Sequence, residues 1–191
     1  MNLNYQDLIT ESYEIAKSKG WWEKPRSIAA LTLLMQSEVI EALEEFRAGK
    51  ALNSIWYERT VRDPNDVKYS IVVPEGQEPT DKPCGIPIEL ADAVIRVADF
   101  VGHYKLCLLA VGYDGPKTFE EGLAEANLRF ARVYEYALTN KLDQNVGSIL
   151  DFAVAAIVAV CEHNGIDLER AIQIKQDFNR TRSHRHGGKL I

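Results

Sequence analysis

Residues 85–100 read GIPIELADAVIRVADF, and the polar side chains in and just after this stretch fall in one narrow helical stripe. The stripe comprises Glu89, Asp92, Arg96, Asp99 and His103. The spacing predicts a helix from about Pro87 to Leu109. Apart from this stripe, almost all side chains of the predicted helix are apolar. A helix that is apolar over so much of its circumference is buried, so the stripe faces a thin solvent edge or an internal polar site. We favour the internal site, and we expect Arg96 to pair with Asp92 or Asp99 along its own helix.

A second acidic stretch precedes this one, since residues 33–46 read LLMQSEVIEALEEF. It belongs to a predicted helix that Ser27 caps and that ends near Arg47. Glu38 and Glu41 are three residues apart, so both lie on one helical face, as Glu89 and Asp92 do on theirs. If the two helices pack antiparallel with these faces together, four carboxylates meet within about 6 Å and each like-charge pair costs roughly 3 kcal/mol.

Such a carboxylate cluster requires a compensating cation. Oxygen-only ligands suit Mg²⁺, with Mn²⁺ as a substitute, much better than zinc. A di-iron bundle would need Glu-x-x-His, and none of the four histidines has a glutamate three positions before it. The sequence therefore predicts a magnesium site, and the usual partner of bound Mg²⁺ is a phosphate ester. The predicted metal ligands are Glu38, Glu41, Glu89 and Asp92.

The rest of the chain is predicted to be mainly helical, which gives an all-α bundle in one domain over residues 1–191. Further helices are expected over residues 4–19, 117–140, 146–163 and 168–179. Prolines and turn residues break the chain between residues 50 and 86, which reads as an irregular insert. Within the insert, IWYERTV and VKYSIVV flank RDPND, so a short β-hairpin fits residues 55–73. Residues 105–145 read as an additional helical segment.

Composition narrows the class of protein. The formal net charge is −6, which speaks against affinity for nucleic-acid polymers or anionic membranes. The three cysteines are scattered and odd in number, as expected for free thiols in a reducing compartment. The N-terminus lacks the pattern of a secretory signal, and the apolar run Phe152–Cys161 is too short to span a bilayer. A cytoplasmic globular protein is predicted.

The two acidic stretches resemble the MazG-like, all-α nucleoside triphosphate pyrophosphohydrolases, which carry ExxE followed by ExxD on adjacent helices. The resemblance extends upstream to WWEKPRSIAAL at residues 21–31, which is similar to the aromatic-x-x-Pro-Arg entry of the dCTP-pyrophosphatase branch. It extends downstream to GIDLERAIQIKQDFNRTRSHRHGGK at residues 165–189, which is similar to a Lys-x-x-x-Asn-x-x-Arg ending. Together these segments cover about half of the chain.

The resemblance implies a fold, a reaction and a set of residues. The fold is a four-helix core, commonly completed by a dimer or tetramer. The reaction is hydrolysis of a nucleoside triphosphate between the α- and β-phosphates, with Mg²⁺ held by the four acidic residues. Lys175, Asn179 and Arg182 are then candidate contacts for phosphate or nucleotide. A phosphoribosyl-ATP pyrophosphatase and a non-catalytic nucleotide- or partner-binding bundle are the alternatives.

Two further residues are assigned from chemistry. Phosphoanhydride hydrolysis needs an activated water, and a carboxylate not fully engaged by metal can accept its proton; Glu41 is our choice. Trp56 lies in the insert, where binding residues are often found, and we choose it over Trp21 and Trp22 as the side chain that stacks on a base.

Overall fold

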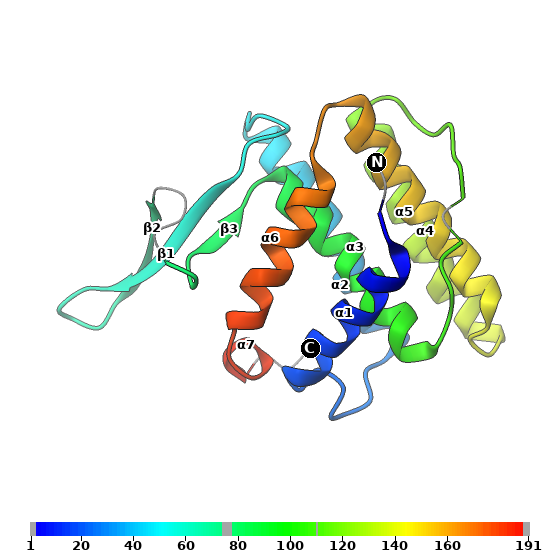
Figure 1. The fold of residues 1–191 in the computed structure, drawn as a ribbon, viewed down its shortest axis with the longest axis horizontal. Coiled ribbons are helices and arrows are strands. Elements are labelled where there is room, and N and C mark those ends of the chain that lie inside the picture. Colours follow the sequence, from blue (N-terminus) through cyan, green and yellow to red (C-terminus); the bar gives the residue numbers. More distant parts are fainter. Residues whose placement is uncertain (1–2, 74–77, 110, 189–191) are drawn as a thin grey trace.

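The computed structural model describes residues 3–73, 78–109 and 111–188, and the predicted insert and additional segment each contain a short stretch outside these ranges. The described chain is mostly helical, with one small sheet (Figure 1). Its helices are α1 (Tyr5–Ser18), α2 (Ile28–Arg47), α3 (Ile86–Tyr104), α4 (Phe119–Thr139), α5 (Gln144–His163), α6 (Leu168–Thr181) and the short α7 (Arg185–Gly188). Its strands are β1 (Trp56–Arg62), β2 (Lys68–Val73) and β3 (Lys82–Cys84).

Most helices begin where a short polar side chain caps the first turn. Asn4, Ser27, Thr118, Asp143 and Asp167 each accept a hydrogen bond from a backbone N–H two or three residues further on. These bonds satisfy amide groups that the helix itself leaves unpaired. The predicted caps at Ser27 and Asp167 are thereby confirmed. Helix α3 begins differently, after Gly85 and with a proline in its first turn.

Helix α3 lies at the centre of the helical body and packs against α1, α2, α5 and α6. From Ile86 to Val101 every residue except Arg96 and Asp99 is buried, as its apolar sequence predicts. Helix α4 covers α2 and α5. Glu38 of α2 contacts Arg96, whereas Glu41 shares a hollow with Glu89. Residue numbers therefore run in opposite directions along the two helices, so the condition set for the carboxylate cluster, an antiparallel arrangement, is met.

Helix α3 is shorter than predicted, because it ends at Tyr104 and not near Leu109. Lys105 takes a left-handed conformation with φ of 54°, and its N–H bonds to the carbonyl oxygen of Gly102. The described residues from 106 to 118 contain no helix, so the additional segment at 105–145 is only partly helical. Its helical part is α4 and the start of α5.

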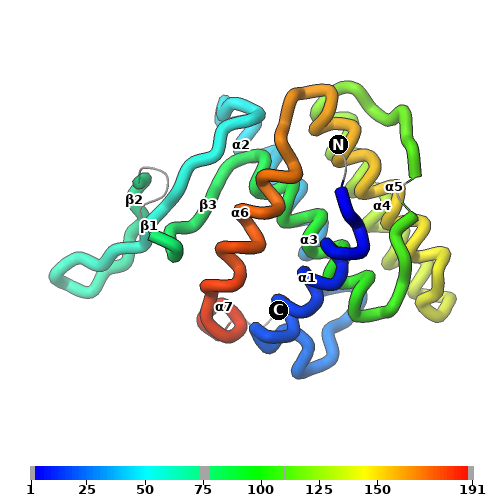
Figure 2. Tube along the Cα trace, in the orientation of Figure 1, coloured from blue at the N-terminus to red at the C-terminus, as the bar shows by residue number. Residues whose placement is uncertain are grey.

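The insert is more regular than predicted. Strands β1 and β2 form the expected antiparallel hairpin, with Tyr57 opposite Val73 and Arg62 opposite Lys68. The short strand β3, which was not predicted, pairs with the other edge of β1. The hairpin projects from the helical body, as the ribbon and the tube drawing show (Figures 1 and 2). Strand β3 leads almost directly into α3, so the sheet is anchored beside the start of that helix.

Helix α5 is long and apolar enough to cross a membrane, being longer than the apolar run noted in its sequence. Of its most apolar 18-residue stretch, 67% is nevertheless buried inside the protein. The helix packs against α4 and α3, as a core helix of a soluble protein does. Its composition is therefore explained by packing.

Gly122 allows α4 to approach α5 closely. A Cβ atom at this position would lie 1.9 Å from Cγ2 of Val160. Alanine normally stabilises a helix relative to glycine. Here we expect Gly122→Ala to lower the free energy of unfolding by about 1–3 kcal/mol through overpacking.

Urea unfolding of Gly122→Ala and of the double variant Gly122→Ala/Val160→Ala measures this effect. The double variant should recover part of the loss because it removes the clashing methyl groups. A single variant as stable as the wild type would contradict the close packing of α4 on α5.

Candidate metal centre and basic cavity

Three carboxylates meet inside the protein where α2 crosses α3. One oxygen from each of Glu38, Glu89 and Asp92 lies within 4.8 Å of the other two. All three side chains are buried. The three-residue spacing on α3 turns both of its acids toward α2, so the sequence pattern itself creates the cluster. We call these three residues the carboxylate cluster.

Two cations pair with the carboxylate cluster: Arg96, which is half-buried, and Lys175, which is buried. Arg96 donates from Nε and Nη2 to Oε1 of Glu38 at 2.7 and 2.6 Å. Nζ of Lys175, whose side chain is only 3% exposed, lies 3.0 Å from Oδ2 of Asp92. The expected pairing of Arg96 within its own helix is therefore wrong. Its guanidinium reaches across to α2, and Asp99 pairs instead with Arg26.

Burial and mutual repulsion change the pKa values of these carboxyl groups. Burial, helped by the charge of Asp92, raises the pKa of Glu38 to about 8. Burial also raises the pKa of Glu89 to about 7, although Lys175 opposes it. Burial raises the pKa of Asp92 too, but Lys175 and Arg96 outweigh it, and the pKa lies below its ordinary value. Without a further cation, two of the three groups therefore tend to hold a proton near neutral pH.

The carboxylate cluster fits a divalent metal ion. It offers oxygen donors alone, held close together by two packed helices, and such donors suit Mg²⁺ or Mn²⁺. The raised pKa values of Glu38 and Glu89 also fit a metal site, because a bound cation would favour the ionised carboxylates. These residues are thus able to hold a metal, and the donor set does not by itself distinguish between the two ions.

Glu41, the fourth predicted ligand, lies beside the cluster and not within it. Its side chain is exposed and lines a hollow together with Glu89 of the carboxylate cluster. Its charge nevertheless contributes to the raised pKa values of Glu38 and Glu89. Glu44, Glu45 and Glu58 line the same hollow. The structure therefore brings three of the four predicted ligands together and places Glu41 at their solvent side.

A second cavity adjoins the carboxylate cluster at Asp92, which lines it. We call it the basic cavity, because four cationic side chains line it: Lys19, Arg26, Arg96 and Arg182. Apolar side chains from α1, α2 and α3 complete its wall. Asp92 and Asp99 are two helical turns apart on α3, so the cavity extends about 10 Å along that helix from the carboxylate cluster.

Two of these cations, Lys19 and Arg182, form no ion pair with a carboxylate among the residues that the structure describes. Burial lowers the pKa of Arg182, although the charge of Asp92 acts to raise it. Nζ of Lys19 donates to the carbonyl oxygen of Arg180 at 2.7 Å. The guanidinium of Arg182 lies over the ring of Phe178, 5.4 Å from its centre. Within the same described ranges, Nε of Arg26 and Oδ1 of Asn179 are buried without a hydrogen-bond partner. The cavity therefore suits an anionic ligand that also forms hydrogen bonds.

The tryptophans are divided between two places. Trp21 lines the basic cavity, and Trp22 lies beside it. Nε1 of Trp22 donates to Oδ1 of Asp99 at 2.6 Å, while its ring stacks on His103 with the centres 3.5 Å apart. Trp56 is not at the basic cavity. It pairs with Cys84 of β3 and lies under Nζ of Lys50, beside the hollow that Glu41 lines.

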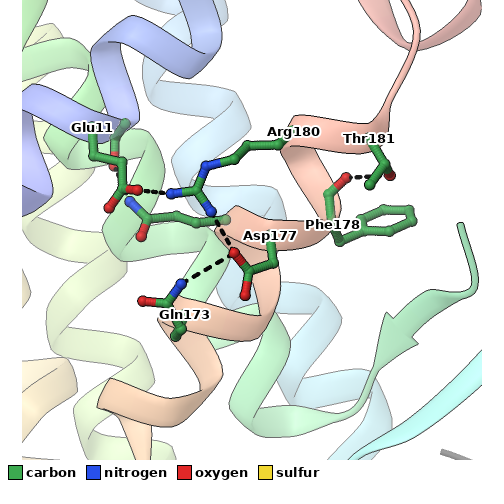
Figure 3. A network of polar contacts seen from close by, with 8 residues as sticks. Glu11, Gln173, Asp177, Phe178, Arg180 and Thr181 are labelled. Atoms are coloured by element: carbon green, nitrogen blue, oxygen red, sulfur yellow. Dashed lines mark hydrogen bonds and ion pairs between the residues drawn. The ribbon is translucent and has the colours of Figure 1, made fainter. Parts of the chain in front are cut away.

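Helices α1 and α6 form two walls of the basic cavity, and polar contacts hold them together. Arg180 reaches from α6 to Glu11 on α1 and also contacts Asp177, as Figure 3 shows. Deeper in the same interface, Nε2 of Gln176 donates to Oγ of Ser12 at 3.2 Å. These contacts fix the distance between the α1 residues and the α6 residues that line the cavity.

The three predicted ligand contacts in and just after α6 all lie at this site. Lys175 pairs with Asp92, while Asn179 and Arg182 line the basic cavity. Sequence reasoning did not identify Lys19, which resembles any lysine in the last turn of a helix before glycine. Arg26 was noted only as the arginine of the Pro-Arg motif, although its side chain is buried in the wall of the cavity.

Comparisons of the chain with protein-family models, curated proteins and solved structures found no match. The resemblance to MazG-like enzymes therefore stays a prediction from motifs, and the geometry described above is what supports a function.

The raised pKa values predict how stability changes with pH. The folded protein binds protons at Glu38 and Glu89 that the unfolded chain releases near its ordinary pKa. The free energy of unfolding of the metal-free protein should therefore fall as pH rises from about 5 to about 8. Asp92, whose pKa is lowered, contributes in the opposite direction only below about pH 4.

Thermal unfolding in a chelating buffer measures this dependence, with Glu38→Gln as the matched variant. The variant should show a smaller fall, because it cannot release that proton. A melting temperature of the wild type that rises over this range would contradict the prediction. Affinity for Mg²⁺ should change in the opposite direction and increase with pH, because the ligands must be ionised.

Proposed function

We propose that the protein is a Mg²⁺-dependent nucleoside triphosphate pyrophosphohydrolase of the MazG-like kind, converting (d)NTP to (d)NMP and pyrophosphate. One observation carries the proposal: Asp92 belongs to the carboxylate cluster and also lines the basic cavity. A metal ion and a polyphosphate chain bound at these two places would be in direct contact. This is the arrangement that phosphoanhydride hydrolysis requires.

Each group of residues has a part in the proposed reaction. Glu38, Glu89 and Asp92 would hold the metal, with Glu41 at their solvent side. When bound, the ion supplies charge neutralisation for the phosphate oxygens and orientation of the attacked phosphorus. Lys19 and Arg182 bind phosphate oxygens from the cavity side. Asn179 offers its buried side-chain oxygen to a hydrogen-bond donor of the ligand.

The chemical step consumes one water molecule. The water oxygen bonds to phosphorus while the bond from that phosphorus to the oxygen bridging the α- and β-phosphates breaks. The water proton passes to Glu41, which is exposed and so accessible to solvent water. The bridging oxygen leaves with the phosphate on its other side, giving the monophosphate and pyrophosphate.

The remaining parts of the proposal follow the resemblance. They are a homo-oligomer, either a dimer or a tetramer, that works in the cytoplasm on free nucleotides and binds neither nucleic-acid polymers nor membranes. Exposed apolar side chains on the outer faces of α2 and α4 are compatible with an interface between subunits. They include Leu33, Ile40 and Leu138.

A substrate panel tests the proposed function. Purified protein is incubated with the common NTPs, dNTPs and phosphoribosyl-ATP, with Mg²⁺, with Mn²⁺ or with a chelator, and pyrophosphate is measured. We expect release with either metal and none with the chelator. Preference for phosphoribosyl-ATP would favour the related pyrophosphatase, and no turnover of any member would refute both enzymes.

A non-catalytic nucleotide- or partner-binding bundle is the second candidate. The observation that favours it is the pairing of Glu38 with Arg96 and of Asp92 with Lys175, which already compensates two of the three carboxylates. Calorimetry distinguishes the candidates: saturable, Mg²⁺-dependent nucleotide binding without release of pyrophosphate would favour the binding module.

A further inference from the structure

The C-terminal segment Ser183–Gly188 folds back against the connection between α1 and α2. The backbone N–H of Arg185 donates to the carbonyl oxygen of Lys19 at 2.8 Å. Nε2 of His184 lies 3.0 Å from Oε1 of Glu23. Figure 1 shows this segment, which includes α7, beyond the end of α6 and beside the end of α1.

The buried Trp21 is the centre of this contact. The ring of His186 meets it edge-on with the centres 5.0 Å apart. The guanidinium of Arg185 lies 5.6 Å from the same ring. Both Trp21 and His186 line the basic cavity. The segment therefore closes one side of the cavity by packing on Trp21, which itself lines the cavity.

Lys19 takes part in the same contact. Its backbone oxygen holds Arg185, while its side chain lines the basic cavity and bonds to the carbonyl oxygen of Arg180. Docking of the C-terminal segment and placement of this ammonium group are thus linked through one residue. Arg185 and His186 have φ of 44° and 50°, a strained backbone that persists only where surrounding contacts stabilise it.

Gly20 allows the segment to approach so closely. A Cβ atom at this position would lie 2.1 Å from Nε2 of His184. Gly49, which follows α2, has nearly the same backbone conformation, with φ of 77° against 80° for Gly20. No atom lies within 4 Å of a Cβ built at Gly49. An alanine at either position meets the same backbone strain, but only one of them displaces His184.

We propose that Ser183–Gly188 is a wall of a polyphosphate-binding cavity and that His186 is a further ligand-contacting residue. The ligand class follows from Lys19 and Arg182, which face the cavity and form no direct ion pair with a carboxylate among the described residues. The inference rests on the proposed function for the nature of this ligand. It goes beyond it by assigning the last described residues of the chain to the binding site.

Calorimetric binding of tripolyphosphate in the presence of Mg²⁺ tests the proposal, because this probe contains the phosphate chain without sugar or base. The full-length variants are Gly20→Ala and His186→Ala, with Gly49→Ala as the matched control. We expect the control to bind as the wild type does. The other two should bind about tenfold more weakly, as expected for the loss of about one hydrogen bond to a charged group.

The intrinsic fluorescence of the tryptophans adds a second readout. Gly20→Ala should change the emission of the unliganded protein, since displacing His184 moves Arg185 and His186, which pack on Trp21, whereas Gly49→Ala should not. If Gly20→Ala does not fold, His186→Ala still decides the question. Unchanged affinity in His186→Ala, or equal losses in Gly20→Ala and Gly49→Ala, would overturn the proposal.

These outcomes are distinguishable from failure of the proposed function. Wild-type protein that binds tripolyphosphate but hydrolyses no nucleotide would refute the enzyme, while the loss in Gly20→Ala and His186→Ala would still support the wall. Wild-type protein that does not bind tripolyphosphate would overturn the wall, whatever the substrate panel shows.

Discussion

Glu89→Gln and Asp92→Asn are each expected to reduce Mg²⁺-dependent release of pyrophosphate at least about a hundredfold, because a lost metal ligand costs several kcal/mol of transition-state stabilisation. Both side chains belong to the carboxylate cluster. Helix α3, which the structure describes throughout, has no exposed acidic side chain beside them that could replace either one as a metal ligand. The amides keep the shape of the carboxyl groups, so the core of α3 should stay packed. Initial rates with the best nucleotide of the panel measure the effect.

Glu135→Gln is the matched control, because Glu135 is an exposed carboxylate on α4 outside the carboxylate cluster. It should keep the activity of the wild type. A calorimetric titration with Mg²⁺ alone separates loss of metal from loss of chemistry, and both cluster variants should bind the ion more weakly than Glu135→Gln. Full activity in either cluster variant would remove the basis for the proposed reaction.

Lys175→Met is expected to lower the free energy of unfolding of the metal-free protein by about 3–5 kcal/mol, the usual cost of removing one partner from a buried ion pair. The methionine fills the space of the lysine stem but leaves Asp92 buried without its cation. Urea unfolding in the presence of a chelator measures the loss. This effect is expected to be larger than that of Gly122→Ala, because a buried unpaired charge costs more than an overlap that shifts of the packed helices can relieve.

The double variant Lys175→Met/Asp92→Asn provides the control through a double-mutant cycle. Removing the charge of Asp92 as well should restore much of the lost stability, because no unpaired ion then remains. Lys17→Met, at an exposed lysine of α1, should have little effect. Equal losses in Lys175→Met and in the double variant would show that Lys175 stabilises the fold by some contact other than Asp92.

Much of the helical architecture could be predicted from the sequence because helices carry local signals. The apolar spacing located α1, α2, α4, α5 and α6 to within a few residues, and caps such as Ser27 and Asp167 marked their starts. The end of α3 before Lys105 was missed. Glycine or proline usually signals the end of a helix, but here a lysine takes the left-handed conformation that ends it. Strand β3 was missed because three residues carry no periodicity, and only pairing with β1 makes them a strand.

The site was predictable where it depends on spacing within one helix. Glu89 and Asp92 had to share a face, and an antiparallel α2 brought Glu38 to them. What could not be predicted is how neighbouring helices rotate against one another. Because of that rotation, Arg96 pairs with Glu38 and not with Asp99, and Glu41 lies at the surface. The family-like ending predicted Lys175, Asn179 and Arg182 as a group, but not that Lys175 would be enclosed with Asp92.

The internal ion pairs of the carboxylate cluster also separate two events that many metalloproteins combine. In small zinc domains the chain is unfolded until the metal arrives. Here Arg96 and Lys175 neutralise part of the cluster from within, so a newly made chain is able to complete its core before any ion is captured. If the carboxylate cluster binds Mg²⁺ as proposed, loading is a late and reversible step, and a cell short of magnesium accumulates an intact, idle protein instead of a misfolded one.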